Sequence, residues 1–243
     1  SGRIGCDDFS TGMPAMFKTL LKNFFLIALF AAVPLMGAHG AETAAPDSAP
    51  AQAHSEVTVG SAAPIFVLPD VRGGEVSLPG LLTEGPVVLS FYRGSWCPYC
   101  NDQLYGFQEV LPEIEKLGAK LVAVSPELPE SAMDMALKKQ LTFHVLHDQN
   151  NAIARTYGLI WPVPDDKRAW LDGKLKEKHG KNLAEFNGIE TYELPIPATF
   201  VINSDGTIVY LFKDPDYTKR ADNKDILAAL KTLSEAGESK KTK

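Results

Sequence analysis

The chain has 243 residues, of which 45% are hydrophobic and 22% are charged. This is an ordinary globular composition, with enough apolar material for one sizeable core and not clearly for two. The net charge of −6 gives no electrostatic reason to expect nucleic acid as a partner. We therefore expect one globular domain that does not bind nucleic acid.

The first 40 residues have the features of an export signal. Lys18 and Lys22 form a positive region, and an uninterrupted apolar run follows from Phe24 to Val33. Pro34 closes this run after about half of the ~20 residues that a membrane span needs. Residues 38–40 (AHG) resemble a small-x-small cleavage site. We expect cleavage and export to the periplasm. The alternative is an uncleaved segment that anchors the protein to a membrane.

Composition also sets the expected domain limits. Residues 1–15 precede the targeting pattern and are interpreted as upstream sequence. Residues 41–56 are rich in Ala, Pro and Ser without apolar periodicity, which is typical of a flexible linker. The domain is expected over residues 57–235, followed by a disordered basic tail at 236–243.

From residue 57 onward, strand and helix patterns alternate. Short apolar, β-branched runs indicate buried strands, and apolar residues spaced by three and four indicate helices. The expected elements are a strand at 86–92, a helix beginning near residue 100, a strand at 119–125, a helix at 129–140, a strand at 141–148, a short helix at 150–158, two strands within 198–213 joined at 203–206, and a closing helix at 221–233. The polar stretch 161–190, with a helix expected at 165–179, is interpreted as an insertion on the rim. This order predicts an α/β fold with a central mixed sheet and helices on both faces.

The cysteine count narrows the chemistry. Cys6 lies upstream of the expected cleavage, so the mature chain would hold only Cys97 and Cys100. Exported proteins commonly use cysteines as scattered structural disulfides. A bridge within one four-residue motif closes too small a loop to remove much entropy from the unfolded chain. We therefore interpret this pair as functional rather than structural.

Cys97 and Cys100 lie where an expected strand meets an expected helix. The first turn of a helix supplies unpaired N–H groups and a positive dipole end, which lower a thiol pKa from its usual ~8.5. Pro98 suits the first helical position. We expect Cys97 to be exposed as the attacking thiolate, and Cys100, one turn further on, to be shielded as the resolving thiol. Trp96 would cover the pair, or pack under the loop as a core aromatic.

A zinc site is the alternative use of the pair, because His144 and His147 complete a CxxC…HxxH pattern. However, residues three apart on a strand point to opposite faces. Compact zinc fingers also place their His pair about a dozen residues after the cysteines, and here the separation is far greater. We therefore expect neither a metal nor another cofactor. The two histidines are interpreted as an edge or core residue and a turn residue.

Four separated segments resemble the thioredoxin-fold superfamily, specifically the peroxiredoxin-like branch of the alkyl hydroperoxide reductase/thiol-specific antioxidant (redoxin) family. They are VGSAAPIFVLPDVRGGEVSL (59–78), FYRGSWCPYC (91–100), HDQNNAIARTYGL (147–159) and LPIPATFVINSDGTIV (194–209). The resemblance implies a thioredoxin-like fold. It also implies that Pro197 is a cis-proline facing the cysteines, where an extended disulfide substrate could pair with the backbone.

The active loop departs from the family pattern. Typical peroxiredoxins place a Pro seven residues and a Thr three residues before the attacking cysteine, and an Arg at the start of a later strand. Here the first two positions hold Ser90 and Gly94, and the third falls on or beside Pro197. Arg93 is the nearest substitute: it could stabilise a thiolate or a departing oxygen, or it could form a surface ion pair. The CPYC motif resembles the dithiol of glutaredoxins.

Three functions follow from these features. The first is a thiol-dependent peroxidase, in which Cys97 attacks a hydroperoxide, Cys100 condenses with the resulting sulfenic acid, and a thioredoxin-like donor reduces the disulfide. The second is a thiol–disulfide oxidoreductase that acts on protein disulfides. The third is a non-catalytic redox sensor. The resemblance outside the loop favours the first.

Overall fold

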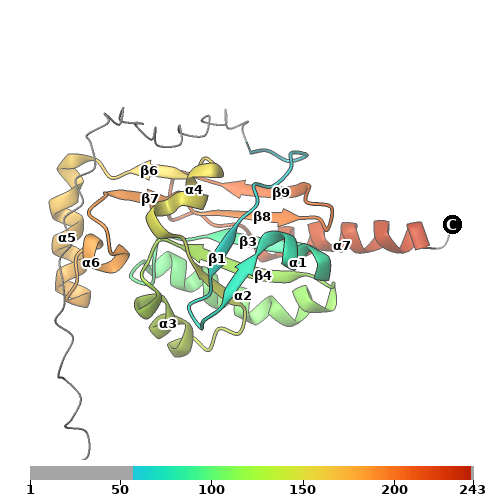
Figure 1. Ribbon diagram of the computed structural model, residues 1–243, viewed down its shortest axis with the longest axis horizontal. Coiled ribbons are helices and arrows are strands. Elements are labelled where there is room, and N and C mark those ends of the chain that lie inside the picture. Colours follow the sequence, from blue (N-terminus) through green and yellow to red (C-terminus); the bar gives the residue numbers. More distant parts are fainter. Residues whose placement is uncertain (1–56, 242–243) are drawn as a thin grey trace, which may run out of the picture. The chain divides into compact units, whose positions relative to one another are not determined.

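A computed structural model describes residues 57–241, which are built around a five-stranded sheet (Figure 1). Its strands, in spatial order, are β5 (His144–His147), β4 (Lys120–Ser125), β3 (Val87–Phe91), β8 (Ala198–Ile202) and β9 (Ile208–Lys213). β3 pairs with β4 and β4 with β5 in parallel, whereas β8 pairs antiparallel with β3 and β9. The predicted mixed sheet is therefore confirmed, and so is the hairpin at residues 203–206.

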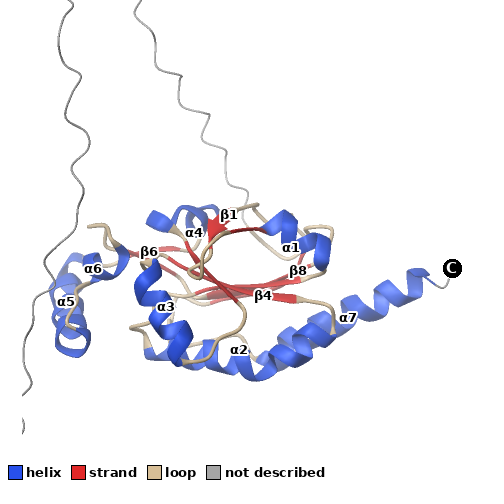
Figure 2. Cartoon of the chain, turned by 60° about the horizontal axis from the view of Figure 1, so that its bottom comes forward, coloured by secondary structure: helices blue, strands red, loops and turns tan. Residues whose placement is uncertain are grey.

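Helices cover both faces of this sheet, as the order of elements predicted (Figure 2). One face carries α2 (Pro98–Lys116), α3 (Pro129–Lys138) and α7 (Asn223–Lys241), and the other carries α1 (Leu78–Glu84) and α4 (Ala152–Thr156). Successive strand residues point to opposite faces. Val88 accordingly packs with the α2 side and Leu89 with the α1 side. Burying β3 on both faces fixes the point where the chain leaves the sheet for the cysteine loop.

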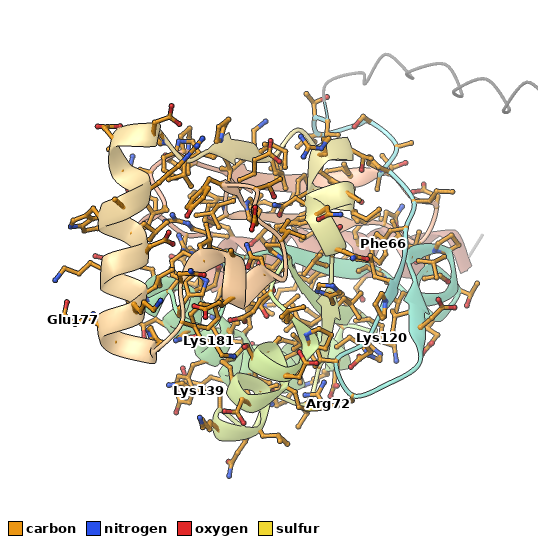
Figure 3. All side chains as sticks on the ribbon, turned by 60° about the vertical axis from the view of Figure 1, so that its left-hand side comes forward. Phe66, Arg72, Lys120, Lys139, Glu177 and Lys181 are labelled. Carbon is orange, nitrogen blue, oxygen red and sulfur yellow. The ribbon has the colours of Figure 1, made fainter. Side chains whose placement is uncertain are left out.

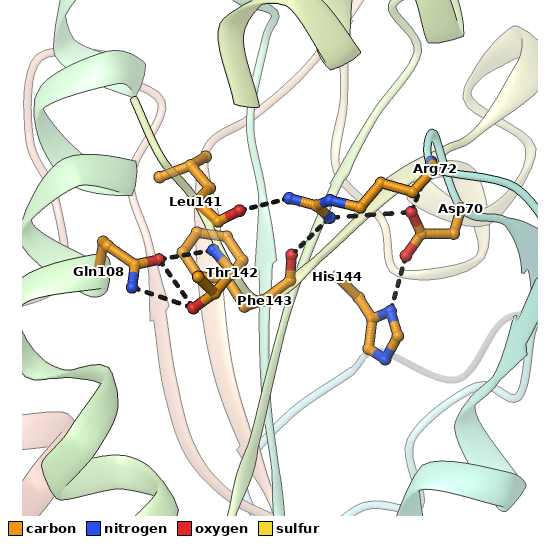
Figure 4. Close-up of polar contacts among 7 residues, drawn as sticks. All are labelled: Asp70, Arg72, Gln108, Leu141, Thr142, Phe143 and His144. Carbon is orange, nitrogen blue, oxygen red and sulfur yellow. Dashed lines mark hydrogen bonds and ion pairs between the residues drawn. The ribbon is translucent and has the colours of Figure 1, made fainter. Parts of the chain in front are cut away.

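A short hairpin, β1 (Val67–Pro69) with β2 (Glu75–Ser77), precedes α1. Figure 4 shows how its turn is tied to the segment leading into β5. The Arg72 guanidinium donates to the carbonyl oxygens of Leu141 at 2.5 Å and Phe143 at 2.9 Å. Asp70 pairs with His144 Nδ1 at 2.6 Å. These contacts stabilise the edge strand, and they place His144 at the edge of the sheet.

The insertion at 161–190 has a structure of its own. It contains α5 (Asp165–His179), as predicted, and α6 (Leu183–Asn187), and it is closed by the antiparallel pair β6 (Ile160–Pro162) and β7 (Glu193–Pro195). The Asp172 carboxylate joins its parts by accepting hydrogen bonds from the Leu183 N–H at 3.0 Å and from the Tyr192 hydroxyl. Figure 3 shows α5 at one end of the domain.

The C-terminal segment differs from its prediction. α7 continues to Lys241, so residues 236–241 extend the helix instead of forming the expected disordered tail. Good helix formers such as Glu, Ala and Lys make up much of this stretch. At the other end, the Asp222 carboxylate caps the helix by accepting a hydrogen bond from the Lys224 N–H at 2.9 Å.

The expected signal peptide (1–40) and linker (41–56) lie outside the described residues, as does Cys6. Within residues 57–241, no helix is both long enough and apolar enough to cross a membrane.

The buried face of α2 is expected to dominate the stability of the site. Leu104 is fully buried, whereas the adjacent Tyr105 is 49% exposed. Leu104→Ala should lower the free energy of unfolding by about 2–5 kcal/mol, because it leaves a cavity under the helix. Tyr105→Ala, the matched control, should cost less than about 1 kcal/mol. Urea denaturation followed by circular dichroism measures both, and equal losses would contradict this packing.

Candidate active site

The cysteine loop is a tight turn between β3 and α2. Cys97 is the N-cap residue of α2, with φ −90° and ψ 115°, and Pro98 occupies the first helical position as predicted. The Cys97 N–H donates to the Gly94 carbonyl at 3.1 Å. The Cys97 carbonyl in turn accepts hydrogen bonds from the N–H groups of Cys100 and Asn101, both at 3.1 Å. The Cys97 thiol therefore lies at the positive end of a 19-residue helix.

Cys97 is only 1% exposed, so the expectation of an exposed attacking thiol is wrong. Aromatic side chains from distant segments, Trp161 and Tyr217, lie around the loop together with Trp96. Cys100 is fully buried, as expected. Both thiols are unpaired with other cysteines. Cys97 is one of the residues that line a cavity.

The two thiols have opposite acidities. The pKa of Cys97 is lowered from 9.0 to about 6, chiefly because the Cys100 thiol donates a hydrogen bond to the Cys97 sulfur. The backbone N–H of Cys100 and the charges of Arg93 and Arg220 lower this pKa further. The pKa of Cys100 is raised well above its ordinary value. Burial is the main cause, and the hydrogen bond that the Cys100 thiol donates to Cys97 is the second. At neutral pH, Cys97 is therefore the thiolate and Cys100 the protonated partner.

Arg93 lies in an aromatic cage rather than in a surface ion pair. Its guanidinium carbon is 4.4 Å from the ring centroid of Tyr217, 5.3 Å from Trp96 and 5.5 Å from Trp161. The residue is 6% exposed, and burial lowers its pKa while Cys97 and Cys100 favour its charged form. No carboxylate in the described part of the chain pairs with it. The surface ion-pair alternative is therefore wrong, and this cation is available to the sulfur and to an oxygen beside it.

Arg220 is a second cation at the pair, and sequence reasoning missed it. Its Nη2 donates to the Cys100 sulfur at 3.4 Å. Its Nη1 donates to the carbonyl oxygens of Lys219, at 2.7 Å, and of Tyr217, which holds the guanidinium in place. It lies 120 residues from Cys100 in a loop before α7, where no local pattern marks it.

The Trp96 indole packs so closely against residue 94 that only a glycine fits there. Its φ of +147° is a conformation that favours glycine, and a Cβ placed there would lie 2.4 Å from Trp96 Nε1. A Thr, the residue typical of peroxiredoxins at this position, does not fit against the indole. Trp96 is itself 9% exposed and belongs to the core cluster that contains both cysteines. It therefore packs as a core aromatic and also lines the cavity at Cys97.

Ser90 occupies the other substituted position, inside the sheet. Its hydroxyl lies 3.2 Å from the Thr199 hydroxyl and donates to the Ala198 carbonyl at 3.4 Å. Gln103, on the second turn of α2, donates to the same Thr199 oxygen at 3.4 Å. A small polar network therefore links β3, β8 and α2 behind the cysteines.

Pro197 does not have the geometry that the family resemblance implied. The described chain contains no cis peptide bond, so Ile196–Pro197 is trans. The two residues form an extended link from β7 into β8, and the Ile196 N–H donates to the Leu159 carbonyl at 2.6 Å. The Ile196–Leu159 hydrogen bond continues the pairing of β7 with β6 up to the residue before Pro197. Pro197 lines a second cavity of about 240 Å³ that it shares with Arg93.

A buried carboxyl group, Glu127, holds the start of the loop. Glu127 is fully buried and accepts hydrogen bonds from the Ser95 N–H at 2.9 Å and the Ser95 hydroxyl at 2.5 Å. Burial raises its pKa to about 7, and the Ser95 hydrogen bonds oppose this shift. Its position directly after the second buried strand could have suggested a site residue, because such strand ends meet at one sheet edge.

The histidines of the alternative zinc pattern have other partners. His144 pairs with Asp70, and His147 Nδ1 lies 2.7 Å from the Glu127 carbonyl oxygen. Within residues 57–241, no three His, Cys, Asp or Glu side chains are grouped closely enough to hold a metal ion.

A cavity of about 570 Å³ adjoins Cys97. The cysteine loop forms one wall and α5 of the insertion forms another, through Trp170, Leu171 and Leu175. Leu171 and Leu175 belong to the same core cluster as Cys97. The insertion therefore shapes the space in front of the sulfur.

Comparisons with known proteins agree with this architecture. The AhpC/TSA family profile matches residues 59–211. The chloroplastic peroxiredoxin Q of Sedum lineare is 35% identical over 130 residues, covering 52% of this chain and 67% of the relative. The thiol-disulfide oxidoreductase ResA of Bacillus thuringiensis is 30% identical over 139 residues, covering 57% and 75%.

Solved structures show the same fold. The peroxidoxin BcpB from Mycobacterium tuberculosis has a TM-score of 0.55 at 20% identity, covering 72% of this chain and 97% of that one. A peroxiredoxin-like protein from Aquifex aeolicus has a TM-score of 0.57 at 19% identity, covering 74% and 89%. The expected thioredoxin-like fold, in its peroxiredoxin form, is therefore confirmed.

The acidity of Cys97 can be measured by alkylation with iodoacetamide across pH, read by mass spectrometry of the Cys97 peptide. The rate should rise with pH through a midpoint of about 6 and then level off, because the thiolate is the reacting form. Cys100→Ala should raise this midpoint by removing the main hydrogen bond, whereas Cys100→Ser, which keeps a donor, should raise it less. A midpoint near that of a free thiol, ~8.5, would contradict the assignment.

The contact of Gly94 with Trp96 can be tested against Gly73, whose φ is +102° with nothing within 4 Å of a Cβ. Gly73→Ala should cost only the backbone strain, of order 1–3 kcal/mol. Gly94→Ala should cost about 1–3 kcal/mol more, because the indole must move, and it should change the Trp fluorescence. Equal losses of stability with unchanged fluorescence would show that the indole does not require a glycine.

Proposed function

The chain belongs to the AhpC/TSA family, and we propose that it is a thiol-dependent peroxidase that reduces hydroperoxides with Cys97 and Cys100. The observation that carries this proposal is a low-pKa thiolate, 1% exposed, that lines a cavity. A small hydroperoxide can enter such a space. A folded protein's disulfide cannot reach this sulfur unless the aromatic side chains around it move.

In the first step, the Cys97 thiolate attacks the outer oxygen of the hydroperoxide. The S–O bond forms as the O–O bond breaks, so the sulfur is oxidised to a sulfenic acid and the peroxide is reduced to an alcohol or water. The leaving oxygen carries the negative charge away from the sulfur and takes up a proton from water to give the alcohol or water. Arg93 is suited to stabilise that oxygen, because its guanidinium is buried beside Cys97 and has no carboxylate partner in the described chain.

In the second step, the Cys100 sulfur attacks the Cys97 sulfenic acid and releases water, which forms the disulfide. The negative charge on Cys97, which helps to keep Cys100 protonated, is then gone. Arg220, at 3.4 Å from the Cys100 sulfur, remains and favours its thiolate. Oxidation of the first thiol therefore prepares the second one to react.

Reduction of this disulfide by two thiols of a thioredoxin-like donor would complete the cycle. Cys97 would be the sulfur attacked first, because it lies on the cavity and Cys100 is fully buried. We also infer that the reaction takes place in the periplasm. Lys18, Lys22 and the apolar run that follows them support export.

Disulfide exchange with client proteins is the second candidate. The ResA relative and the CPYC dithiol favour it. Two structural features weigh against it: Cys97 is covered, and the Ile196 N–H, which an extended client would need, is bonded to Leu159. A non-catalytic sensor would share the cysteines but would need no recycling donor.

Stopped-flow mixing of the reduced protein with hydrogen peroxide, followed through Trp fluorescence, tests the proposal. Trp96 directly precedes Cys97 in the loop that must change when the disulfide forms. We expect oxidation far faster than that of a free thiol. Cys97→Ser should abolish it, and Cys100→Ser should keep the first step but form no intramolecular disulfide.

A rate no faster than that of a free thiol would refute the peroxidase. The Cys100→Ser variant then separates the alternatives, since stable mixed disulfides between Cys97 and client proteins would support exchange.

A further inference from the structure

We propose that Glu127 is a positioning residue for the peroxide reaction. Through Ser95, it holds Arg93 and Cys97 in the relative position that the attack requires, and it does so most firmly as a carboxylate. This inference rests on the peroxidase function above and adds to it a residue and a pH dependence. It is carried by the hydrogen bonds of Ser95 and by a buried carboxyl group that the reaction steps leave unused.

Ser95 is the centre of the segment between the two reactive side chains. Arg93 precedes it by two residues and Cys97 follows it by two, and residues 94–96 belong to neither β3 nor α2. In the attack, the Cys97 sulfur and the Arg93 guanidinium must act on the two oxygens of one O–O bond. Movement of Ser95 would therefore change the geometry of the reacting groups.

Every polar group of Ser95 is bonded to another segment. Its N–H and its hydroxyl donate to the Glu127 carboxyl at 2.9 and 2.5 Å, and its carbonyl oxygen accepts a hydrogen bond from Asn101 Nδ2 at 2.8 Å. Asn101 lies in the first turn of α2. Glu127 therefore receives two of the three hydrogen bonds that fix Ser95, and it lies outside the loop.

Glu127 is itself held in place from two sides. It lies between β4 and α3, directly after Pro126, whose φ is restricted. His147 Nδ1, at the end of β5, is 2.7 Å from the Glu127 carbonyl oxygen. The Leu128 N–H donates to the Phe186 carbonyl of α6 at 2.8 Å. The main sheet and the insertion thus both fix the backbone that carries this carboxyl group.

The Glu127 carboxyl group is buried without a paired cation. Within residues 57–241, Glu127 forms no ion pair, and Lys181, whose charge favours the carboxylate, donates to the Ser131 hydroxyl at 3.0 Å. The other titratable side chains around it are Tyr92 of β3, which its charge affects, and His147 of β5, which contacts its backbone. Burial therefore dominates, and the pKa of Glu127 is raised from 4.5 to about 7.

This pKa makes the carboxyl group unfavourable for the fold. A carboxyl pKa that is higher in the folded chain than in the unfolded chain gives a stabilising contribution below about 4.5, which is lost as the pH rises through about 7. The amide of a glutamine would accept from the Ser95 N–H and donate to its hydroxyl without this loss. The carboxyl group is therefore better explained by the reaction than by stability.

Ionisation of Glu127 strengthens its hold on Ser95. Hydrogen bonds to a carboxylate are about twice as strong as those to a neutral acceptor. Between pH values of about 6 and 7, Cys97 is already a thiolate, whereas Glu127 is still largely protonated. The rate of oxidation by peroxide is therefore expected to depend on both groups.

The test is the rate of Cys97 oxidation by hydrogen peroxide, measured by stopped flow across pH for the native protein and for Glu127→Gln. The ratio of the two rates removes the Cys97 step that they share. We expect this ratio to rise about fivefold with a midpoint near 7. Glu130→Gln is the matched control, since Glu130 is exposed three residues further on, and its ratio should stay constant.

Two further variants measure the hold itself. Glu127→Ala should slow oxidation about 100-fold, because the reacting groups lose their alignment. Ser95→Ala removes only the hydroxyl bond of a partly exposed residue and should slow it about fivefold, which keeps the test available if Glu127→Ala does not fold.

Iodoacetamide separates positioning from a general structural defect. Alkylation needs the Cys97 thiolate but not its alignment with Arg93, so Glu127→Gln should leave the alkylation rate and its midpoint unchanged. The same variant should unfold at a higher temperature than the native protein at about pH 8, with a difference that shrinks as the pH falls. A flat ratio of oxidation rates, or alkylation slowed as much as oxidation, would overturn the inference.

Failure of the peroxidase function would look different. Hydrogen exchange of the Ser95 amide, followed by NMR and corrected for its intrinsic pH dependence, reports the bond to Glu127 without any peroxide. If no variant reacts with peroxide while this amide is protected in the native protein and not in Glu127→Ala, the role in peroxide attack is overturned together with the function. The hold of Glu127 on the loop would then remain as a property of the fold.

Discussion

The burial of a negatively charged sulfur is the constraint on which the rest of the site depends. An ionised group removed from water is costly unless compensating charges or hydrogen bonds surround it. Here the first turn of α2, the Cys100 thiol, Arg93 and Arg220 supply that compensation for Cys97. The mixed sheet brings these groups together. The cysteine loop follows β3, and Arg220 lies in the segment after β9. A solvent-exposed thiolate would be stabilised by water and would not need these charges and hydrogen bonds.

The same constraint explains why the loop departs from the usual peroxiredoxin pattern. Arg93 lies among Tyr217, Trp96 and Trp161, and these rings stabilise a cation that has no carboxylate beside it in the described chain. Packing the Trp96 indole in this arrangement requires Gly94 at a position where the family typically has Thr. The loop therefore lacks the hydroxyl of the typical Thr and instead has aromatic rings around Arg93. The insertion completes the enclosure, because Trp161 and the α5 residues form the remaining wall of the cavity.

Local patterns in the sequence predicted the strands of the main sheet, its long helices and the place of the cysteine pair between a strand and a helix, because these features depend on neighbouring residues. The helix at 165–179, the strand leading to Cys97 and the first-turn Pro98 all follow from periodicity or backbone preference. The burial of Cys97 and the contact of Arg220 with Cys100 were not predictable in this way, since their partners lie far along the chain. The cis geometry of Pro197 was expected from family resemblance alone, and the described chain contains no cis peptide bond.

In the proposed reaction, Cys97 reacts directly with a peroxide oxygen. Its most direct test is the intact mass of the reduced Cys100→Ser variant after one equivalent of hydrogen peroxide at neutral pH, with the modified peptide then identified. We expect one oxygen atom to be added at Cys97 and trapped there, because the resolving thiol is absent. An unmodified Cys97, or oxygen added elsewhere in the chain, would contradict it.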